Sequence, residues 1–305
     1  MKWKKLGRII NETSLNWTPI GMMLPLAHLI DNDTIRIYFG GRSSDLYSRI
    51  GFIDVASDNL FDIIQKSEQP IVNIGDLGTF DDCGLTPCCV IKDANNFHMY
   101  YTGVTLLKRT TFTNSIGILT SLDNGTNLHR YSKGPIFSRN IFDPYQVGHP
   151  WVVRGKDKWR MWYFSGTSWE HVEELDNPKH FYTIKHAYSK DGLNWIPDDN
   201  ICINYNGDEF SICRPCVIFE NGTYKMWYTY RGDSRSYRIG YAESSDGLQW
   251  TRLDNRVGID VSDEGWDSEM LCYPYVFDLK GKRYLLYNGN GYGRTGFGLA
   301  VQKEG

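Results

Sequence analysis

The sequence predicts an all-β fold, a five-bladed β-propeller of four-stranded antiparallel blades that forms a single domain over residues 1–305. A strand-opening proline recurs at intervals of about 60 residues, long enough for four strands and their turns. Two further strand patterns follow each proline, and the last copy lacks an outer strand that the N-terminus can supply. The recurring prolines are Pro25, Pro87, Pro150, Pro215 and Pro274.

The clearest copy of the repeat spans residues 214–250. Apolar and polar residues alternate with period two in its three strand segments, which is typical of strands with one buried face. The dipeptides Asn221-Gly222 and Asp246-Gly247 favour tight hairpin turns. An outer strand is expected to begin at Trp250, so this copy predicts one complete blade.

The second and third strands of the other units follow the same pattern. Second strands are expected at residues 37–40, 99–103, 161–166 and 285–289. Third strands are expected at residues 50–53, 116–119, 184–188 and 297–300. Together they predict the three inner strands of every blade.

The N-terminus is expected to complete the last blade. That unit stops after its third strand, at residues 301–303, whereas the N-terminal run at Trp3 resembles the outer strands that begin at Trp195 and Trp250. Pairing the N-terminus there would close the ring and remove an open sheet edge. The alternative is an N-terminal tail outside the sheet.

Composition narrows the function. A net charge of −3 argues against general binding of nucleic acid, which requires a basic surface. No apolar run approaches the ~18 residues of a membrane span. We therefore expect a cytoplasmic protein with no nucleic-acid or membrane partner, and the sequence leaves its oligomeric state open. Four of the seven cysteines, Cys88, Cys213, Cys216 and Cys272, recur beside the strand-opening prolines, so they are interpreted as small apolar residues of the inner strands. The alternative is zinc or redox chemistry at Cys213 and Cys216, but this pair stands alone, and neither a metal nor a cofactor is expected.

Acidic residues lie in the approach loops, the connections that lead into the inner strands. If these loops open on one mouth, the carboxylates converge there, and paired carboxylates suit glycoside hydrolysis because one donates a proton while the other activates water or attacks. The alternative is that each acid forms a turn or caps backbone N–H groups. The candidate catalytic residues are Asp143, Glu209, Asp81, Asp82, Asp267 and Glu269.

Basic and aromatic residues are expected at the same mouth. Their guanidinium groups either neutralise the carboxylates or bind an anionic part of the substrate, and their rings either stack on a sugar or pack between blades. The candidate substrate-binding residues are His149, Arg214, Trp266, Tyr273, Arg42, Arg231 and Trp169.

Three motifs resemble a known group of proteins. They are the Trp-Asp-Ser approach to the proline in residues 266–274, the Met-Trp-Tyr strand at residues 226–228, and the Ser-x-Asp-Gly-x-x-Trp turn of residues 189–195 and 244–250. The chain resembles the five-bladed propeller glycoside hydrolases of families 43, 32, 62 and 68 and the family-130-like glycosylases.

The resemblance implies a catalytic set, because these families use an Asp base or nucleophile from the first blade, an orienting Asp and a Glu acid. It implies Asp143 as the orienting residue and Glu209 as the acid. The first blade has Trp17-Thr18 at the matching position, so either Asp81 or Asp82 substitutes or the reaction is a different one.

Three functional hypotheses follow. The first is an inverting glycosidase for a small, possibly anionic sugar conjugate bound in a central funnel. The second is a glycoside phosphorylase or another sugar-processing enzyme. The third is a non-catalytic propeller that binds a glycan or a nucleotide sugar, which the missing first-blade Asp favours.

Overall fold

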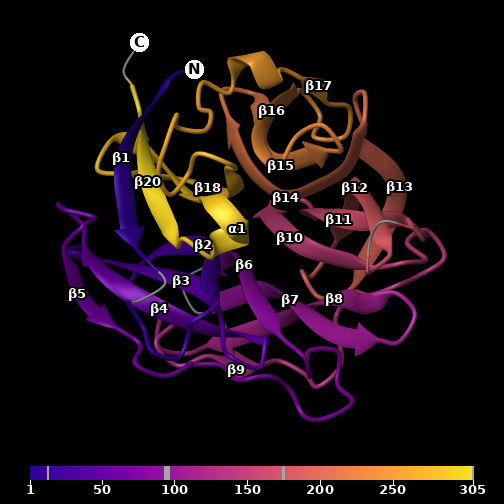
Figure 1. Cartoon of the computed structure of the whole chain (residues 1–305), viewed down its shortest axis with the longest axis horizontal. Helices are drawn as coiled ribbons and strands as arrows, with labels where there is room; N and C mark the ends of the chain where they lie inside the picture. The colour runs from indigo at the N-terminus through magenta and orange to yellow at the C-terminus, as the bar shows by residue number, and fades with distance from the viewer. Residues whose placement is uncertain (12–13, 93–96, 174–175, 304–305) are drawn as a thin grey trace.

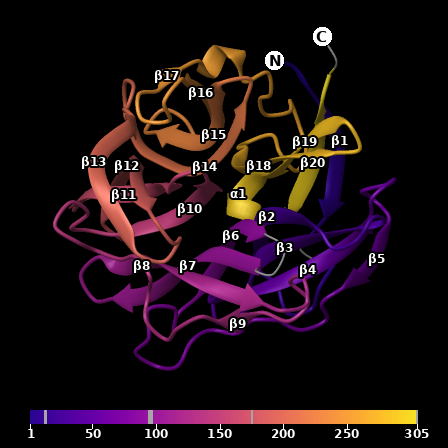
Figure 2. The ribbon, with the colours of Figure 1, turned by 180° about the vertical axis from the view of Figure 1, so that it is seen from behind.

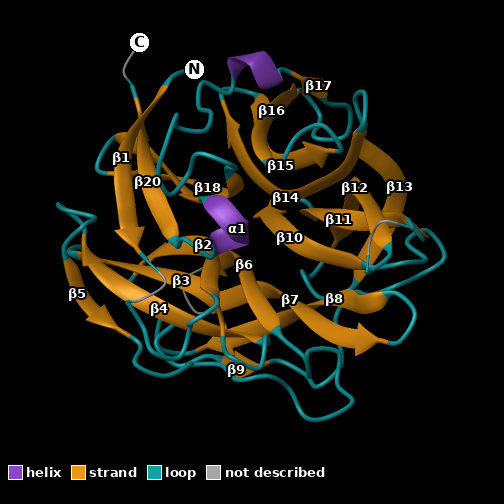
Figure 3. Cartoon of the chain, in the orientation of Figure 1, coloured by secondary structure: helices purple, strands orange, loops and turns teal. Residues whose placement is uncertain are grey.

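Antiparallel strands make up most of the regular structure in the computed structural model, which describes residues 1–11, 14–92, 97–173 and 176–303. Within these ranges the helical elements are the short 3₁₀ turn η1 (Asp254–Arg256) and α1 (Asn290–Gly293) (Figure 3). Neither is long and apolar enough to cross a membrane.

The strands form units of four, and each unit corresponds to one copy of the sequence repeat. Unit 1 contains β2 (Gly21–Leu29), β3 (Thr34–Arg42), β4 (Ser48–Ala56) and β5 (Ile63–Lys66). Unit 2 contains β6 (Leu85–Lys92), β7 (Phe97–Leu107), β8 (Thr111–Ser121) and β9 (His129–Arg130). Unit 3 contains β10 (Val147–Arg154), β11 (Trp159–Glu170), β12 (Lys179–Ser189) and β13 (Trp195–Ile203). Unit 4 contains β14 (Glu209–Glu220), β15 (Thr223–Gly232), β16 (Arg238–Ser244) and β17 (Thr251–Arg252). Unit 5 contains β18 (Cys272–Leu279), β19 (Lys282–Asn288), β20 (Phe297–Gln302) and β1 (Trp3–Ile10).

The units are arranged around a common centre (Figures 1 and 2). Their first strands, β2, β6, β10, β14 and β18, lie nearest to that centre. A single parallel bridge between Tyr182 and Ser211 joins units 3 and 4 into one eight-stranded sheet. The architecture is therefore all-β and propeller-like, as the sequence repeat predicts.

The N-terminal strand β1 pairs antiparallel with β20 in unit 5, where the sequence places it. Trp3 and Ile10 on this strand are buried, and Lys5 Nζ lies 2.7 Å from Asp267 Oδ2. In both views the N and C labels lie near each other at the same edge (Figures 1 and 2). The N-terminal segment is thus an ordered part of the sheet.

Each inner strand is bent at its proline. The register of β2, β6, β10, β14 and β18 shifts at that point, as in a β-bulge. In four units the residue before the proline has a positive φ, which is strained for any residue other than glycine. These residues are Leu24, His149, Arg214 and Tyr273. The bulges set the backbone where the inner strands approach the centre.

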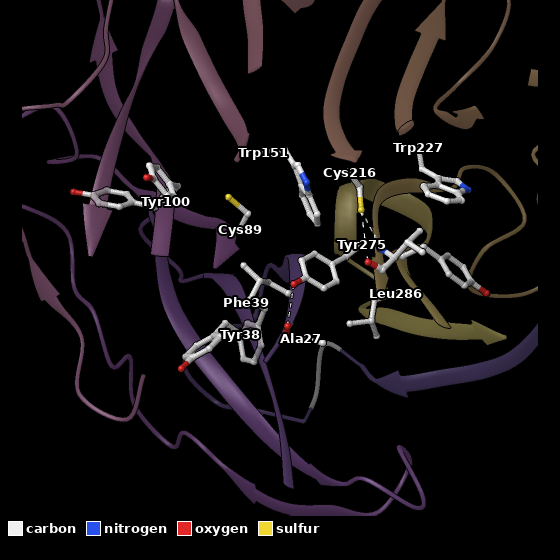
Figure 4. Close-up of a cluster of buried hydrophobic side chains, with 14 of the residues drawn as sticks. Ala27, Tyr38, Phe39, Cys89, Tyr100, Trp151, Cys216, Trp227, Tyr275 and Leu286 are labelled. Carbon is white, nitrogen blue, oxygen red and sulfur yellow. Dashed lines mark hydrogen bonds between the residues drawn. The ribbon is translucent and has the colours of Figure 1, made fainter. Parts of the chain in front are cut away.

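Apolar contacts between inner strands of different units fill the region around the centre (Figure 4). The rings of Trp151 and Tyr275 lie 5.4 Å apart between centroids, and the Tyr275 hydroxyl donates to the Ala27 carbonyl over 3.0 Å. Cys89 and Cys216 are buried beside them as free thiols. The inner-strand cysteines therefore pack as small apolar groups.

Candidate functional site

A cavity of about 210 Å³, here called the central cavity, opens near the N-terminal ends of the inner strands. The bulge residues Leu24, His149 and Tyr273 contribute to its wall, together with Thr86 at the equivalent position of β6. The remaining wall comes from residues late in the second strands and early in the third strands, around the connections between them. Further lining residues are Arg42, Thr102, Phe112, Asn114, Gln146, Phe164, His180 and Tyr182.

Buried polar atoms without a hydrogen-bond partner gather around this cavity. They are Arg42 Nε, Asn114 Oδ1, Gln146 Oε1 and His149 Nδ1. Gln146 is only 1% exposed, so bulk water does not satisfy its oxygen. Each such atom costs about 1–3 kcal/mol when it is left unpaired, and native proteins contain few of them. Four such atoms around one small cavity mark hydrogen-bonding positions that ordered water or a polar ligand can satisfy.

His149 is held neutral in the folded chain. Burial and the nearby Arg214 guanidinium lower the pKa of its imidazole to about 3 from the ordinary 6.5. The ring packs edge-on against Phe164 and Tyr273, with centroids 5.0 Å and 5.9 Å away. At neutral pH His149 therefore offers the cavity a neutral hydrogen-bonding nitrogen and no charge.

Unfolding is expected to take up protons between about pH 3 and pH 6.5, since His149 is protonated in the unfolded chain but neutral in the folded one across that range. The free energy of unfolding should therefore rise with pH through this window, by up to ~1.4 kcal/mol per pH unit for one group, and level off above it. Urea unfolding between pH 4 and pH 8 measures the slope. His149→Gln should reduce it and His129→Gln, on the exposed β9, should not; equal slopes in wild type and His149→Gln would contradict the assignment.

A larger pocket of about 770 Å³, here called the outer pocket, adjoins the central cavity through the shared lining residues Phe112 and His180. The His180 ring lies between Trp169 and Tyr182, with centroid distances of 4.9 Å and 5.0 Å. Burial and then Arg231 lower the pKa of His180 to about 4. Arg231, Lys179, Arg235, Phe210 and Tyr292 also line the outer pocket.

Of the predicted substrate-binding residues, His149, Tyr273 and Arg42 line the central cavity, and Trp169 and Arg231 line the outer pocket. Arg214 is completely buried. Its Nη1 donates to the Pro87 carbonyl over 3.3 Å, while Nε and Nη2 have no partner. Five of the seven predicted substrate-binding residues therefore line one of the two pockets.

Trp266 belongs to neither pocket. Its ring stacks on Tyr287 with centroids 5.3 Å apart and covers Gly289 and Gly298, where a Cβ would collide with the ring. Phe80 covers Tyr101 in the same way in unit 2, at 5.7 Å. The aromatic residue of the approach loop is a packing element within the unit, so the structure supports the packing interpretation of Trp266.

Asp143 is anchored inside unit 3. Its Oδ2 accepts from the Tyr163 hydroxyl over 3.0 Å and from Asn140 Nδ2 over 2.9 Å, and Lys185 Nζ lies 3.6 Å from Oδ1. The side chain is fully buried. These partners tie the approach loop to the second and third strands.

The same anchor recurs in two other units. Asp81 accepts from the Tyr101 hydroxyl over 3.0 Å and pairs with Arg130 over 2.8 Å. Asp267 accepts from Tyr287 over 3.1 Å and pairs with Lys5. In unit 1, Thr18 stands at the position of the acid and Phe39 at the position of the tyrosine. The carboxylate and the hydroxyl are therefore both absent from that unit.

Two of the other three candidate acids have partners for their carboxylates, and the side chain of the third, Glu269, is exposed. Glu209 pairs with Arg252 through both carboxylate oxygens, at 2.7 Å and 3.0 Å. Asp82 Oδ2 accepts from the backbone N–H of Gly78 over 2.9 Å. The backbone N–H of Glu269 donates to Asn290 Oδ1 over 2.8 Å.

The expected convergence of carboxylates on one mouth is not what the structure contains. In the part of the chain that is described, none of the six candidate acids lines the central cavity or the outer pocket. Asp81 borders a separate pocket of about 410 Å³, beside Arg130. Asp81, Asp82, Asp143, Glu209 and Asp267 each have a hydrogen-bond donor or a cation elsewhere in the fold, and the Glu269 side chain is exposed.

Tyr163→Phe is expected to lower the free energy of unfolding by about 1–3 kcal/mol, because it removes a donor from the buried Asp143. Chemical denaturation measures the loss. The reverse change in unit 1, Phe39→Tyr, is the matched control and should not stabilise, since Thr18 offers no carboxylate there. An unchanged stability of Tyr163→Phe would contradict the anchor.

Sequence reasoning missed Asn114, Gln146 and Phe112. Asn114 and Phe112 lie on the extended hairpin of β7 and β8, and Gln146 precedes β10. No motif marks these positions, and their orientation depends on how far the hairpin extends over the cavity. The one signal in the sequence was the length of the segment between the predicted second and third strands of this unit, residues 104–115.

Comparison with known proteins agrees on the fold. No family model matches the chain. A solved structure described as a glycoside hydrolase is 16% identical and covers 99% of this chain and 92% of its own, with a TM-score of 0.75. A thermostable family-43 glycoside hydrolase is 17% identical over 92% of this chain and 88% of its own, with a TM-score of 0.67. The fold is therefore that of the propeller glycoside hydrolases, as the sequence resemblance implied.

Two relatives in sequence come from Mycobacterium tuberculosis. The protein MT1551 of strain CDC 1551 is 40% identical, and Rv1502 of strain H37Rv is 39% identical. Each match covers 99% of this chain and 99% of the relative. The chain therefore belongs to the same protein family as MT1551 and Rv1502.

Proposed function

We propose that this protein binds a sugar conjugate, with a sugar group held in the central cavity. The observation that carries the proposal is the set of unpartnered atoms on Arg42, Asn114, Gln146 and His149. Sugar hydroxyls both donate and accept hydrogen bonds, so one ring can satisfy amide oxygens, a guanidinium and an imidazole together. The rings of Phe164 and Tyr273 supply the apolar contact that the carbon face of a sugar needs.

The residues of the central cavity fit sugar binding better than they fit hydrolysis by a pair of carboxylates. Hydrolysis of that type needs two carboxyl groups on either side of the glycosidic bond, about 5–9.5 Å apart. The described lining of the central cavity contains amides, hydroxyls, imidazoles and a guanidinium but no carboxylate. Glycoside hydrolysis is the second candidate, favoured by the solved structures that share the fold.

The experiment is calorimetric titration of neutral hexoses, hexuronic acids and hexose 1-phosphates into wild type and Gln146→Leu. At least a tenfold loss of affinity is expected in Gln146→Leu, with no loss of thermal stability because the Oε1 of Gln146 has no protein partner to lose. Gln65→Leu, on the exposed outer strand β5, is the matched control. Affinity that is unaffected by Gln146→Leu would refute the proposal.

Turnover separates the two candidates. Aryl glycosides and the same sugar conjugates are incubated with and without inorganic phosphate, and product is measured for wild type, Asp143→Asn and Glu209→Gln. The binding proposal expects no product from any of them. Turnover by wild type that the variants lose while they keep ligand affinity would establish the hydrolase instead.

We also infer that the repeat units close into a single five-bladed propeller. The pairing of β1 with β20 supports closure, and the central placement of the first strands supports the blade arrangement. Closure matters for the site, because the central cavity takes residues from units 1, 2, 3 and 5.

A further inference from the structure

Some arginine side chains of this protein form ion pairs with carboxylates and others do not. Away from the central cavity several are held in short ion pairs: Arg36 with Asp54, Arg130 with Asp81, Arg252 with Glu209, and Arg283 with Glu220. Among the described residues no carboxylate forms an ion pair with Arg42, Arg214 or Arg231. Two of these guanidinium groups line the proposed site, Arg42 in the central cavity and Arg231 in the outer pocket.

Aromatic rings and two hydrogen bonds hold the guanidinium of Arg231 in the outer pocket. Its Cζ lies 4.8 Å from the centroids of both Phe210 and Tyr237, so aromatic rings flank the guanidinium. Its Nη1 donates to the Tyr292 hydroxyl over 2.9 Å and its Nε to Ser211 Oγ over 3.4 Å. These contacts fix the orientation of the group without neutralising its charge, and the other guanidinium donors remain for an acceptor.

The neighbouring charges do not supply a counter-ion. Two carboxylates line the same pocket: that of Asp233 pairs with Lys179, and among the described residues that of Asp176 forms no ion pair with Arg231. His180, which joins the pocket to the central cavity, is held neutral by burial and by Arg231 itself. The outer pocket therefore presents an oriented cation to whatever enters it.

The sizes of the two spaces indicate a ligand that extends across both. The central cavity, at about 210 Å³, is below the ~300–1,000 Å³ range typical of small-molecule sites. The outer pocket adds about 770 Å³ and shares Phe112 and His180 with it. A ligand with its sugar in the central cavity would reach Arg231 with its substituent.

We propose that Arg231 binds an oxyanion, a phosphoryl or carboxylate group, on the sugar conjugate. The ligand class is therefore an anionic sugar, and this deepens the proposed function and rests on it for the position of the sugar ring. Planar guanidinium groups bind both kinds of oxyanion through paired hydrogen bonds. The flanking rings partly bury the guanidinium, and partial burial strengthens its attraction for an anion.

The test is calorimetric titration of hexose 1-phosphates, hexuronic acids, the parent neutral hexoses and inorganic pyrophosphate into wild type, Arg231→Met and Arg160→Met. Arg160 is the matched control, because it also lies over a ring, that of Tyr224 at 5.6 Å, and donates to a backbone carbonyl, but it lines neither pocket. We expect an anionic sugar to bind wild type at least tenfold more tightly than its neutral parent. Arg231→Met should abolish that preference while the neutral affinity stays within twofold, and Arg160→Met should retain it.

The outcomes separate the two proposals. Preference for the phosphate or for the uronate identifies which oxyanion the site takes. Equal affinity for anionic and neutral sugars, or a preference that survives in Arg231→Met, overturns the oxyanion site and leaves sugar binding intact. Pyrophosphate binding that depends on Arg231 without any sugar binding overturns the sugar proposal alone, and no binding of any probe overturns both.

Discussion

A chain that lacks residues 1–10 is expected to lose cooperative folding. Trp3 and Ile10 are buried in unit 5, and each buried large apolar side chain contributes about 1.5–3 kcal/mol. The deletion also leaves the buried Asp267 without Lys5, a loss of about 3–5 kcal/mol when one partner of a buried pair is removed. The sum is comparable with the ~5–15 kcal/mol that stabilises a typical domain.

Thermal unfolding followed by circular dichroism, with size-exclusion chromatography, measures this effect. The truncated chain should melt without a sharp transition or aggregate through the exposed edge of β20. Lys4→Ala, an exposed change on the same strand, should melt as wild type does. A truncated chain with unchanged melting temperature would show that β1 is dispensable and that closure does not stabilise the ring.

Arg214→Met is expected to stabilise the folded chain and to weaken ligand binding. The guanidinium is fully buried with two nitrogens unpartnered, and burying an uncompensated charge is costly. Replacing buried charged groups with apolar side chains of similar volume can add about 1–4 kcal/mol. Because Arg214 lowers the pKa of His149, its charge acts on a residue of the central cavity, so its loss should reduce the affinity for an anionic ligand.

Chemical denaturation and calorimetry measure the two effects together. Arg214→Lys keeps the charge and should gain no stability. If Arg214→Met instead unfolds more easily, the bond to the Pro87 carbonyl is the important contact and the guanidinium is structural. A gain in stability with unchanged affinity would remove Arg214 from the binding site.

The strands were predictable because their signals are local. The period-two patterns, the Asn-Gly and Asp-Gly turns and the recurring prolines each specify a strand or turn without reference to distant residues. The place of β1 followed from the strand missing after Val301. The positive φ values at His149, Arg214 and Tyr273 were not predictable, because the residue before a proline normally adopts an extended conformation.

The position of an acidic residue within the repeat does not determine the direction in which its carboxylate points. The sequence places Asp81, Asp143 and Asp267 at similar positions in their units, but it does not say which way each side chain turns. A comparison of the repeat units does indicate where these carboxylates point. Units 2, 3 and 5 combine the acid with a tyrosine hydroxyl on the second strand, and in unit 1 both are replaced. In unit 4 the corresponding tyrosine, Tyr228, donates to Asp254 and not to an acid of the approach loop. The joint replacement in unit 1 is therefore the signal in the sequence for a contact inside units 2, 3 and 5.

The cavity residues were harder to predict because they depart from the repeat singly. Asn114 and Gln146 have no counterpart in the other copies, and they line one cavity only because unit 2 packs beside unit 3. Long-range packing of this kind leaves no local pattern. Departures from a repeat near its axis therefore locate a site more reliably than the features that the copies share.

The most direct test of the account is the crystal structure of the protein soaked with the sugar conjugate that binds tightest in the calorimetric panel. We predict electron density for a sugar ring in the central cavity, within hydrogen-bond distance of Gln146 and His149, with its oxyanion at Arg231. Density against Asp143 or Glu209, with the central cavity filled only by water, would contradict the account.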